Sequence, residues 1–241
     1  MKDNLVVGGG EVGSAINSIL KGSEIFDIDP TKNSVSQKRY LNLHICFPYN
    51  RDFVKSVQKY QKQFKPSLTI IHSTVPLGTS DKLKAVHSPV RGIHPHLAKS
   101  LKIFPKFFGG PKARLAAEIF DRVGVKILCT PKAETTEAMK LWDTTIYGLN
   151  IILEKEIHKF CEDNSVDFDV VYTKANQSYN AGYRILGRPE YQKYVLSHVP
   201  GGVGGHCVIA NAELLKSTSA KRLVKENAEF VKAKSRRSKS K

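Results

Sequence analysis

Cysteine is scarce in this sequence of 241 residues, and its four cysteines lie far apart. They form no Cys-x-x-Cys pair, so neither a zinc ribbon nor the disulfide framework of a small secreted protein is expected. Long apolar runs are also absent, which excludes a membrane-spanning helix. We expect no signal peptide, because Lys2 and Asp3 precede only three apolar residues before a glycine run. These absences favour a protein of the reducing cytoplasm.

Acidic residues are outnumbered, with 22 Asp and Glu against 38 Lys and Arg and a net charge of +16. Such a field attracts anions, among them nucleotides, sugar phosphates and carboxylates. Part of the excess lies in the Ser-rich basic end, where we predict a disordered tail over 233–241. No basic helix with interleaved aromatic residues is present, so a nucleic-acid partner is the weaker alternative. The expected partner is an anionic small molecule.

Short apolar strands alternate with amphipathic helices in the first half of the chain. Strands are expected at 4–7, 24–27, 43–47, 68–71, 84–88, 106–110 and 125–129, and helices at 12–20, 54–64 and 111–123. This alternation is typical of an α/β protein with a doubly wound parallel sheet. We therefore predict a Rossmann-type domain over residues 1–130.

The pattern changes after Thr130. From Ala133 to Asp163 there is no proline and only one glycine, and apolar residues recur every three or four positions. This spacing predicts one long helix. Residues 165–231 are expected to be helical, with glycine-rich interruptions at 182–187 and 200–205. The prediction is an all-helical domain over 131–232 with a long interdomain helix, whose length favours a homodimer.

Three glycines follow the first expected strand in the order Gly8-x-Gly10-x-x-Gly13. The first permits a tight turn, the second lets the backbone approach a pyrophosphate, and the third lets a helix pack on the strand. The start of that helix, at Glu11 and Val12, offers free N–H groups to phosphates. The motif predicts a dinucleotide site, and its alternative is a glycine turn without a ligand.

An acid ends the next expected strand. Asp27 lies nineteen residues past Gly8, where it can accept hydrogen bonds from ribose hydroxyls. It favours NAD over NADP, because a carboxylate repels a 2′-phosphate. Asp29 is the second candidate for this role.

A thiol follows paired glycines near the other end of the chain, in residues 203–207. Paired glycines let the backbone crowd a ligand, and a thiolate at Cys207 would be a nucleophile toward a carbonyl. A buried structural cysteine is the alternative. Cys46, Cys129 and Cys161 lie in apolar patterns and are expected in the core.

Seven segments of the chain form an ordered series. They are the glycine motif with Asp27-Ile28-Asp29, then Cys46-Phe47-Pro48, Ser73 to Thr79, Ser88 to Arg91, Glu137 to Leu141, Asn150 to Glu156, and Gly204 to Val208. Together they resemble the UDP-glucose/GDP-mannose dehydrogenase family of NAD-dependent nucleotide-sugar oxidoreductases. The resemblance covers residues 4–215 and implies a Rossmann domain followed by central helices. The family's second nucleotide-binding domain, which holds much of the UDP-sugar, is not expected in this chain.

The resemblance implies the double oxidation of a primary alcohol to a carboxylate. A hydride leaves to NAD, the aldehyde adds to Cys207, a second hydride leaves the thiohemiacetal, and water cleaves the thioester. Lys140 would stabilise developing oxyanion charge, as an ammonium should. Ser73 and Thr74 would lie near the nicotinamide, and Thr74 also near a catalytic water.

Three positions depart from the family's pattern. Val90 stands where the family has an acid, Thr144 where it has asparagine, and Asn211 where it has aspartate. Acid–base assistance contributes about 10²–10⁴-fold, so the loss of two carboxylates would slow thioester hydrolysis. Two alternatives therefore stay open: an NAD- and nucleotide-sugar-binding protein with impaired catalysis, and a single-step dehydrogenase of the β-hydroxyacid type.

Other polar residues complete the expected site. His206 adjoins the thiol and would act as a base or orient it. His94-Pro95-His96 resembles a chelating pair, but no carboxylate is close in sequence and no metal is expected. The candidates for substrate contact are Arg91 for an anionic group, Asn180 and Tyr183 in a glycine-centred polar loop, and Gly205 beside the thiol.

Overall fold

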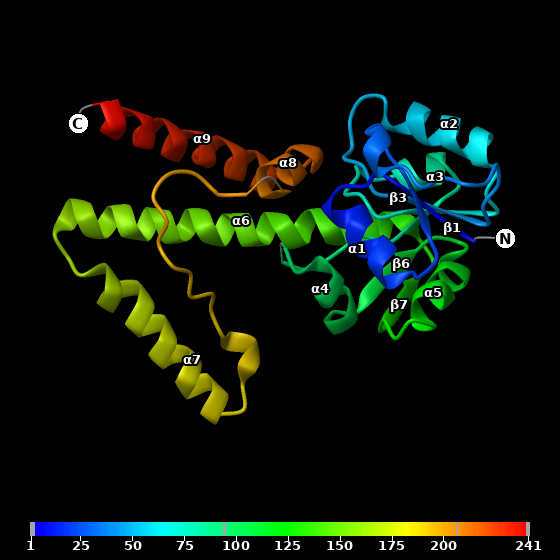
Figure 1. Cartoon of the computed structure of the whole chain (residues 1–241). Helices are drawn as coiled ribbons and strands as arrows, with labels where there is room; N and C mark the ends of the chain where they lie inside the picture. The colour runs from blue at the N-terminus through cyan, green and yellow to red at the C-terminus, as the bar shows by residue number, and fades with distance from the viewer. Residues whose placement is uncertain (1–2, 94, 206, 240–241) are drawn as a thin grey trace. The chain divides into compact units, whose positions relative to one another are not determined.

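The computed structural model describes residues 3–93, 95–205 and 207–239 (Figure 1). The chain divides into two compact units, residues 1–141 and 142–241. The division lies inside the long helix α6 (Ala133–Asn164), whereas we expected a boundary at residue 130. Each unit is described by itself.

The first unit is built on one seven-stranded sheet. Its strands are β1 (Asn4–Val7), β2 (Glu24–Phe26), β3 (Asn42–Ile45), β4 (Leu68–Ile71), β5 (Val86–His87), β6 (Lys106–Gly109) and β7 (Ile127–Thr130). Their order across the sheet is β2-β1-β3-β4-β5-β6-β7. The first five strands are parallel, while β6 pairs antiparallel with β5 and parallel with β7. The sheet is therefore mostly rather than wholly parallel.

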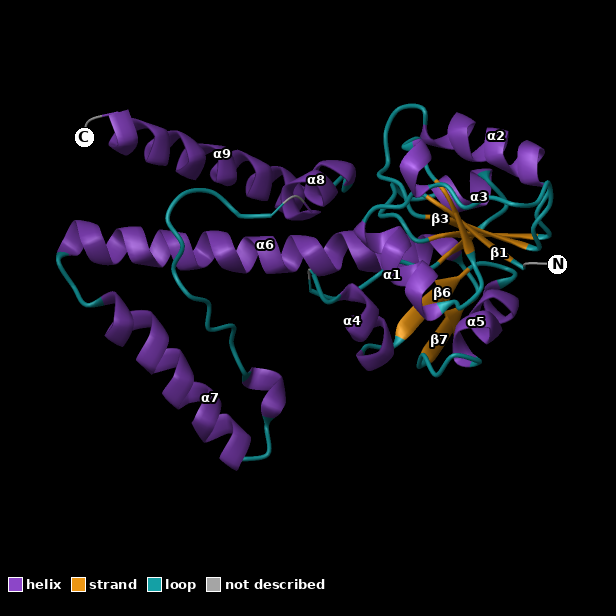
Figure 2. Cartoon of the chain, viewed as in Figure 1, coloured by secondary structure: helices purple, strands orange, loops and turns teal. Residues whose placement is uncertain are grey.

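Helices cover both faces of this sheet (Figure 2). The helices α1 (Glu11–Ile19), α4 (Leu97–Ile103) and α5 (Ala113–Asp121) cover one face, and α2 (Phe53–Phe64) and the short α3 (Thr79–Lys82) cover the other. We expected neither α3 nor α4. The connection 88–105, which contains α4, leaves the carboxyl end of β5 and enters β6 at the same end of the strands, because β6 is antiparallel to β5.

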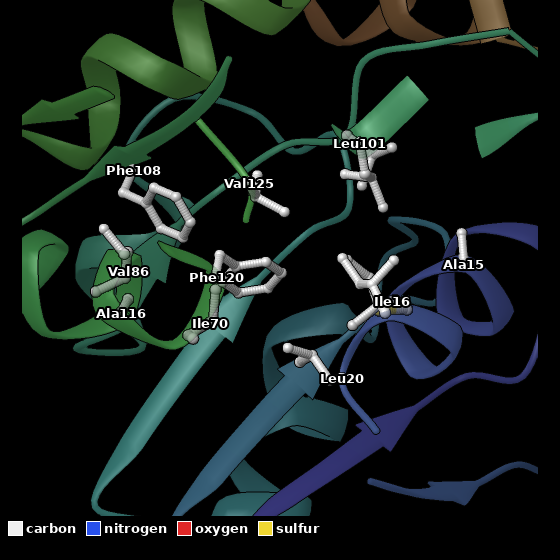
Figure 3. Packing of buried hydrophobic residues seen from close by; sticks show 14 of the residues in the cluster. Ala15, Ile16, Leu20, Ile70, Val86, Leu101, Phe108, Ala116, Phe120 and Val125 are labelled. Atoms are coloured by element: carbon white, nitrogen blue, oxygen red, sulfur yellow. The ribbon is translucent and has the colours of Figure 1, made fainter. Parts of the chain in front are cut away.

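The apolar core explains why these strands form. Alternate residues of each strand face opposite helix layers. Figure 3 shows the layer that contains Ile16 of α1, Phe120 of α5 and Ile70 of β4, all three fully buried. The other layer packs Phe53 and Val57 of α2 against the opposite face. Two buried layers of this kind fix the strand register that places the site.

The order of the strands marks a position for a ligand. From β1 the chain moves to β2 on one side and then to β3 on the other, so the order reverses between β1 and β3. In open α/β sheets ligands bind outside the carboxyl ends of the strands at such a reversal. The glycine turn follows β1 at this edge.

The second unit is helical. Besides the rest of α6 it contains a π-helical segment (Asp169–Lys174), α7 (Ala175–Ile185), a 3₁₀ turn (Pro189–Tyr191), α8 (Cys207–Leu214) and α9 (Thr218–Lys239). Helix α7 continues through Gly182 and ends at Ile185, so the interruption that we expected at 182–187 begins later. The long irregular segment of this unit is 192–205. The expected disordered tail is helical as far as Lys239.

The predicted fold class, a Rossmann-type sheet followed by helices, is confirmed. Within the described ranges, no helix combines the length and the apolar character needed to cross a membrane.

Candidate active site

Two glycines shape the turn after β1, and a third leaves it open. A Cβ on Gly13 would lie 1.7 Å from the carbonyl oxygen of Gly8, so helix α1 can approach the strand only with glycine there. Gly8 has φ +101°, and a Cβ on it would lie 2.9 Å from the backbone nitrogen of Phe47. Apart from its chain neighbours, no atom of the described residues would lie within 4 Å of a Cβ on Gly10. The space in front of Gly10 is therefore free for a ligand.

A cleft of about 430 Å³ lies at this turn, at the reversal of strand order. The turn glycines line it together with Asp27 and Ile28 after β2 and with Cys46, Phe47 and Pro48 after β3. A second hollow, of about 560 Å³, lies along the first turns of α1 from Gly9 to Ser18 and extends to Lys32 and to Pro95. Gly10 lines both, so the start of α1 faces open space on two sides.

Asp27 is the acid that faces the cleft. Its carboxylate accepts hydrogen bonds from the N–H of Asp29 at 2.9 Å and from the N–H of Gly9. These bonds, with the Asp29 N–H first, hold the pKa of Asp27 below its ordinary value. Asp29 caps the 3₁₀ turn Pro30–Lys32, where it accepts from the N–H and hydroxyl of Thr31. Asp27 therefore fits the ribose role better than Asp29.

Ser73 and Thr74 follow β4 at the same edge of the sheet. The Ser73 hydroxyl donates to the carbonyl oxygen of Phe47 at 2.6 Å, which ties this segment to the wall of the cleft. Thr74 is half-buried. The segment also reaches α6, because Glu137 accepts from the N–H groups of Gly78 at 2.6 Å and Ser80 at 2.8 Å.

Lys140 lies one turn beyond Glu137 on α6 and is half-buried. Its ammonium is close enough to the buried imidazole of His87 to lower the pKa of that ring, although burial is the main cause of the shift. The first unit therefore brings the candidate lysine near the polar residues that end β4 and β5.

Arg91 and Val90 follow β5. The Arg91 guanidinium stacks over the rings of Phe104 and Phe107, at 6.0 and 5.8 Å from their centroids. Val90 is 6% exposed and belongs to the apolar core. At position 90, where the family that the sequence resembles has an acid, this chain therefore has an apolar residue of the core.

A buried polar cluster in the first unit was missed by the sequence analysis. His44 contacts His72 at 3.0 Å between ring nitrogens, and both His72 and Lys106 donate to the carbonyl oxygen of Ser88 at 2.8 Å. Burial lowers the pKa of His44 to about 3 and that of Lys106 to about 7. The available signal was a titratable residue within an apolar strand pattern, as in Leu43-His44-Ile45.

The thiol of the second unit is exposed. Cys207 is the first residue of α8 and is a free, exposed cysteine, and Gly205 before it is also exposed, with φ +80°. His206 lies outside the described residues. Of the other cysteines, Cys46 and Cys161 are buried as expected, but Cys129 is exposed, because β7 is the edge strand of the sheet.

The two departing polar residues of the second unit meet. The Asn211 amide, which is 7% exposed, donates to the hydroxyl oxygen of Thr144 at 3.3 Å. Neither an amide nor a hydroxyl is a general base at neutral pH. This pair lies between α6 and α8, one turn past Cys207.

Asn180 and Tyr183 lie on helix α7 and not in a loop, which corrects the expectation of a glycine-centred loop. Both polar atoms of the Asn180 side chain are used by the backbone of Lys193, at 2.8 and 2.9 Å. The ring of Tyr183 packs against those of Tyr179 and Tyr191. These contacts give Asn180 a structural role at the start of segment 192–205.

The segment 192–205 leads to the thiol and is held from two sides. Lys155 of α6 donates to the carbonyl oxygen of Val199, and Asn227 of α9 accepts from the N–H of Val203 at 2.6 Å. In Figure 1 this segment crosses α6, and its last part runs between α6 and α9. Over the described residues, no three His, Cys, Asp or Glu side chains are arranged to hold a metal ion.

Comparison with known proteins gives one curated relative and several similar folds. No protein-family model matches the chain. The UDP-N-acetyl-D-mannosamine dehydrogenase of Pyrococcus horikoshii is 29% identical over 174 residues, which are 64% of this chain and 38% of that protein. The chain thus spans less than half the length of the curated relative that it matches.

Two solved structures share the fold. The UDP-D-ManNAc dehydrogenase of Pyrococcus horikoshii superposes with a TM-score of 0.77 at 19% identity, over 94% of this chain and 68% of that one. The 3-hydroxyisobutyrate dehydrogenase of Mycobacterium tuberculosis superposes with a TM-score of 0.69 at 15% identity, over 95% and 94%. The resemblance indicated by the sequence motifs is confirmed: the chain is similar in sequence and in fold to nucleotide-sugar dehydrogenases.

Proposed function

We propose that this chain is an NAD-dependent oxidoreductase that oxidises a primary alcohol on a nucleotide sugar or a related anionic small molecule, through an adduct on Cys207. The observation that carries the proposal is the cleft at the reversal of strand order, with the glycine turn and Asp27 in its walls. The net charge of +16 supports an anionic substrate.

The residues of the cleft fit NAD. Gly10 leaves room for a pyrophosphate, and the first turn of α1, with Glu11 and Val12, offers N–H groups to it. The Asp27 carboxylate would accept from ribose hydroxyls and repel a 2′-phosphate. NAD, when bound there, supplies the hydride acceptor for each oxidation.

The other residues would handle the substrate. The Cys207 thiolate would add to the aldehyde carbon to form a thiohemiacetal, and a second hydride would leave that carbon to NAD. Water would then cleave the C–S bond of the resulting thioester, which releases the carboxylate and the thiol. The Lys140 ammonium would stabilise the negative charge that develops on oxygen. Thr74 would position the alcohol or a water, and Arg91 would bind an anionic group. Gly205 and Tyr183 would contact the substrate, and His206 would act as a base or orient the thiol.

A single-step dehydrogenase of the β-hydroxyacid type is the second candidate. The Thr144–Asn211 pair favours it, because an amide and a hydroxyl cannot activate the water that cleaves a thioester. Under this reading Lys140 keeps its role and Cys207 has none. A protein that binds NAD without turnover is the third.

A homodimer through α6 is part of the proposal. Four large apolar residues of α6 are 39–60% exposed and are spaced by four or seven positions: Trp142, Ile146, Leu153 and Phe160. Residues at this spacing share one face of a helix. A second copy of the chain would remove that face from water.

Titration with cofactor and substrate tests the proposal. We expect calorimetry to show NAD binding at least about ten-fold tighter than NADP, and Asp27→Asn to reduce that preference. Reduced cofactor is then followed by absorbance while UDP-sugars are offered. Two hydrides per sugar support the cysteine route, one supports the single-step route, and binding without turnover supports an impaired enzyme. Absence of NAD binding contradicts all three.

A further inference from the structure

His87 connects two segments that carry candidate catalytic residues. The imidazole is fully buried at the end of β5, and its Nε2 lies 3.1 Å from the carbonyl oxygen of Ser73, the residue before Thr74. Its Nδ1 lies 2.8 Å from the hydroxyl oxygen of Thr136 on α6. Thr136 and Lys140 are four residues apart and share one face of the helix. One side chain thus spans from the end of β4 to the start of α6.

The hydrogen-bond partners fix the form of this imidazole. A carbonyl oxygen only accepts, so Nε2 carries the proton that is donated to Ser73. In a neutral ring Nδ1 is then an acceptor, and the Thr136 hydroxyl donates to it at 2.8 Å rather than to the carbonyl oxygen of Ala133 at 2.9 Å. Burial, together with the ammonium groups of Lys106 and Lys140, lowers the pKa of His87 to about 3. The ring is therefore neutral, with one defined tautomer, throughout the physiological range.

The surrounding backbone is shaped to let Thr136 reach this ring. A Cβ on Gly109 would lie 2.6 Å from the Thr136 hydroxyl oxygen, closer than carbon and oxygen can approach. Gly109 pairs with His87 across β5 and β6. Glycine at 109 is thus required for α6 to begin where it does. Glu137, the residue after Thr136, accepts hydrogen bonds from the N–H groups of Gly78 and Ser80. Thr136 and Glu137 thus both hold the first turns of α6 by polar contacts.

We propose that His87 is a positioning residue: by joining the Ser73 carbonyl to the Thr136 hydroxyl, it fixes the turn of α6 that carries Lys140 relative to the strand end that carries Thr74. This inference rests on the proposed dehydrogenase function, in which both residues act on the reacting alcohol. A displacement of a catalytic group by about 1 Å can cost on the order of 100-fold in rate. His87 itself is not expected to touch substrate or cofactor.

Thr136→Val tests the proposal, because it removes the hydroxyl and keeps the volume. We expect kcat to fall roughly 10–100-fold, while the Kd for NAD changes less than about three-fold. Thr136→Ser, which restores the hydroxyl, should return kcat to within about three-fold of the parent. The matched control is Thr69→Val, since Thr69 is also buried in this unit and its hydroxyl oxygen accepts a hydrogen bond from the Gln61 amide at 3.1 Å. A kcat in Thr136→Val equal to that of Thr69→Val overturns the proposal.

A second measurement separates failure of this inference from failure of the proposed function. If the parent protein binds NAD without turnover, kcat cannot be compared between variants, but the position of Lys140 can still be followed. Acetylation of Lys140 by acetic anhydride, read by peptide mass spectrometry, should change several-fold in Thr136→Val and stay at the parent rate in Thr136→Ser and Thr69→Val. An unchanged labelling rate in folded Thr136→Val, shown by its thermal transition, overturns the proposal independently of activity.

Discussion

The two units of this molecule differ in how far they bury their apolar side chains. The first unit encloses titratable groups, and His44, His72 and Lys106 are buried and hydrogen-bonded to one another or to backbone carbonyls. The second unit leaves large apolar groups in water, with Phe160 60% and Ile185 86% exposed. Most of the buried apolar residues belong to the first unit, whereas most of the exposed large apolar residues belong to the second.

This difference divides the proposed chemistry. The cofactor cleft is shaped by backbone contacts at Gly8 and Gly13 of the first unit. The thiol of Cys207 begins an eight-residue helix at the end of an irregular segment. Cofactor binding should therefore respond to changes in the first unit alone, and turnover to changes in both.

Removal of the thiol should have the largest effect. Cys207→Ser replaces a strong nucleophile by a hydroxyl, so carboxylate production should fall by at least about 10³-fold. The Kd for NAD should stay unchanged, because the cleft lies in the other unit. Cys129→Ser is the control, since Cys129 is also exposed but belongs to β7. Full activity of Cys207→Ser would contradict the proposed cysteine adduct and favour single-step oxidation.

Two alanine substitutions in the glycine turn should separate folding from binding. Gly13→Ala places a methyl group 1.7 Å from the Gly8 carbonyl oxygen, so we expect a loss of several kcal/mol in unfolding free energy, and NAD binding should be lost with it. Apart from its chain neighbours, the methyl group of Gly10→Ala meets no atom of the described residues within 4 Å, so this variant should fold normally and bind NAD at least about 100-fold more weakly. Urea unfolding and calorimetry measure the two effects. Normal NAD binding by Gly10→Ala would place the dinucleotide elsewhere.

The sequence predicts the fold of the first unit well, because strand formation there depends on local apolar runs such as residues 4–7 and 68–71. It does not predict that β6 runs antiparallel to β5. Alternation of strands and helices does not show whether a connection crosses to the opposite end of the strands or returns at the same end. The short helices α3 and α4 are not predicted, because helices of four and seven residues contain only one or two turns of apolar spacing.

The site is predicted only in part for a similar reason. Gly8, Gly13 and Asp27 are recognisable because their roles are local to one turn and one strand end. The bridge from His87 to Thr136 joins residues 49 positions apart, and only the folded sheet brings them together. Asn180 looks like a ligand residue in sequence, but its amide is used by the backbone of Lys193.

Replacement of the buried ammonium should sharpen the contrast between the units. Lys106 has a pKa of about 7 in the folded state against 10.5 when exposed. Below pH 7 it is charged in both states, so the fold bears the full cost of burying it, and this cost fades as pH rises from 7 toward 10.5. Lys106→Met should therefore add on the order of 1–4 kcal/mol at pH 6 and less at pH 9.

Urea unfolding at the two pH values measures this gain. The control is Lys112→Met, because Lys112 is an exposed lysine of the same unit. A loss of stability at pH 6 would show that the bonds from Lys106 to the Ser88 and Pro89 carbonyl oxygens outweigh its desolvation. A gain that grows toward pH 9 would contradict the direction of the pKa shift.

The smallest expected effect concerns Gly182, in the interior of α7. Beyond the neighbouring backbone of α7, no atom of the described residues would lie within 4 Å of a Cβ there, and glycine in a helix costs about 0.5–1 kcal/mol relative to alanine. Gly182→Ala should raise the unfolding free energy by that amount and leave turnover unchanged if α7 only supports segment 192–205 through Asn180. If turnover falls while stability rises, this surface contacts substrate or needs to bend during the reaction. The second unit would then be catalytic along α7 as well as at the start of α8.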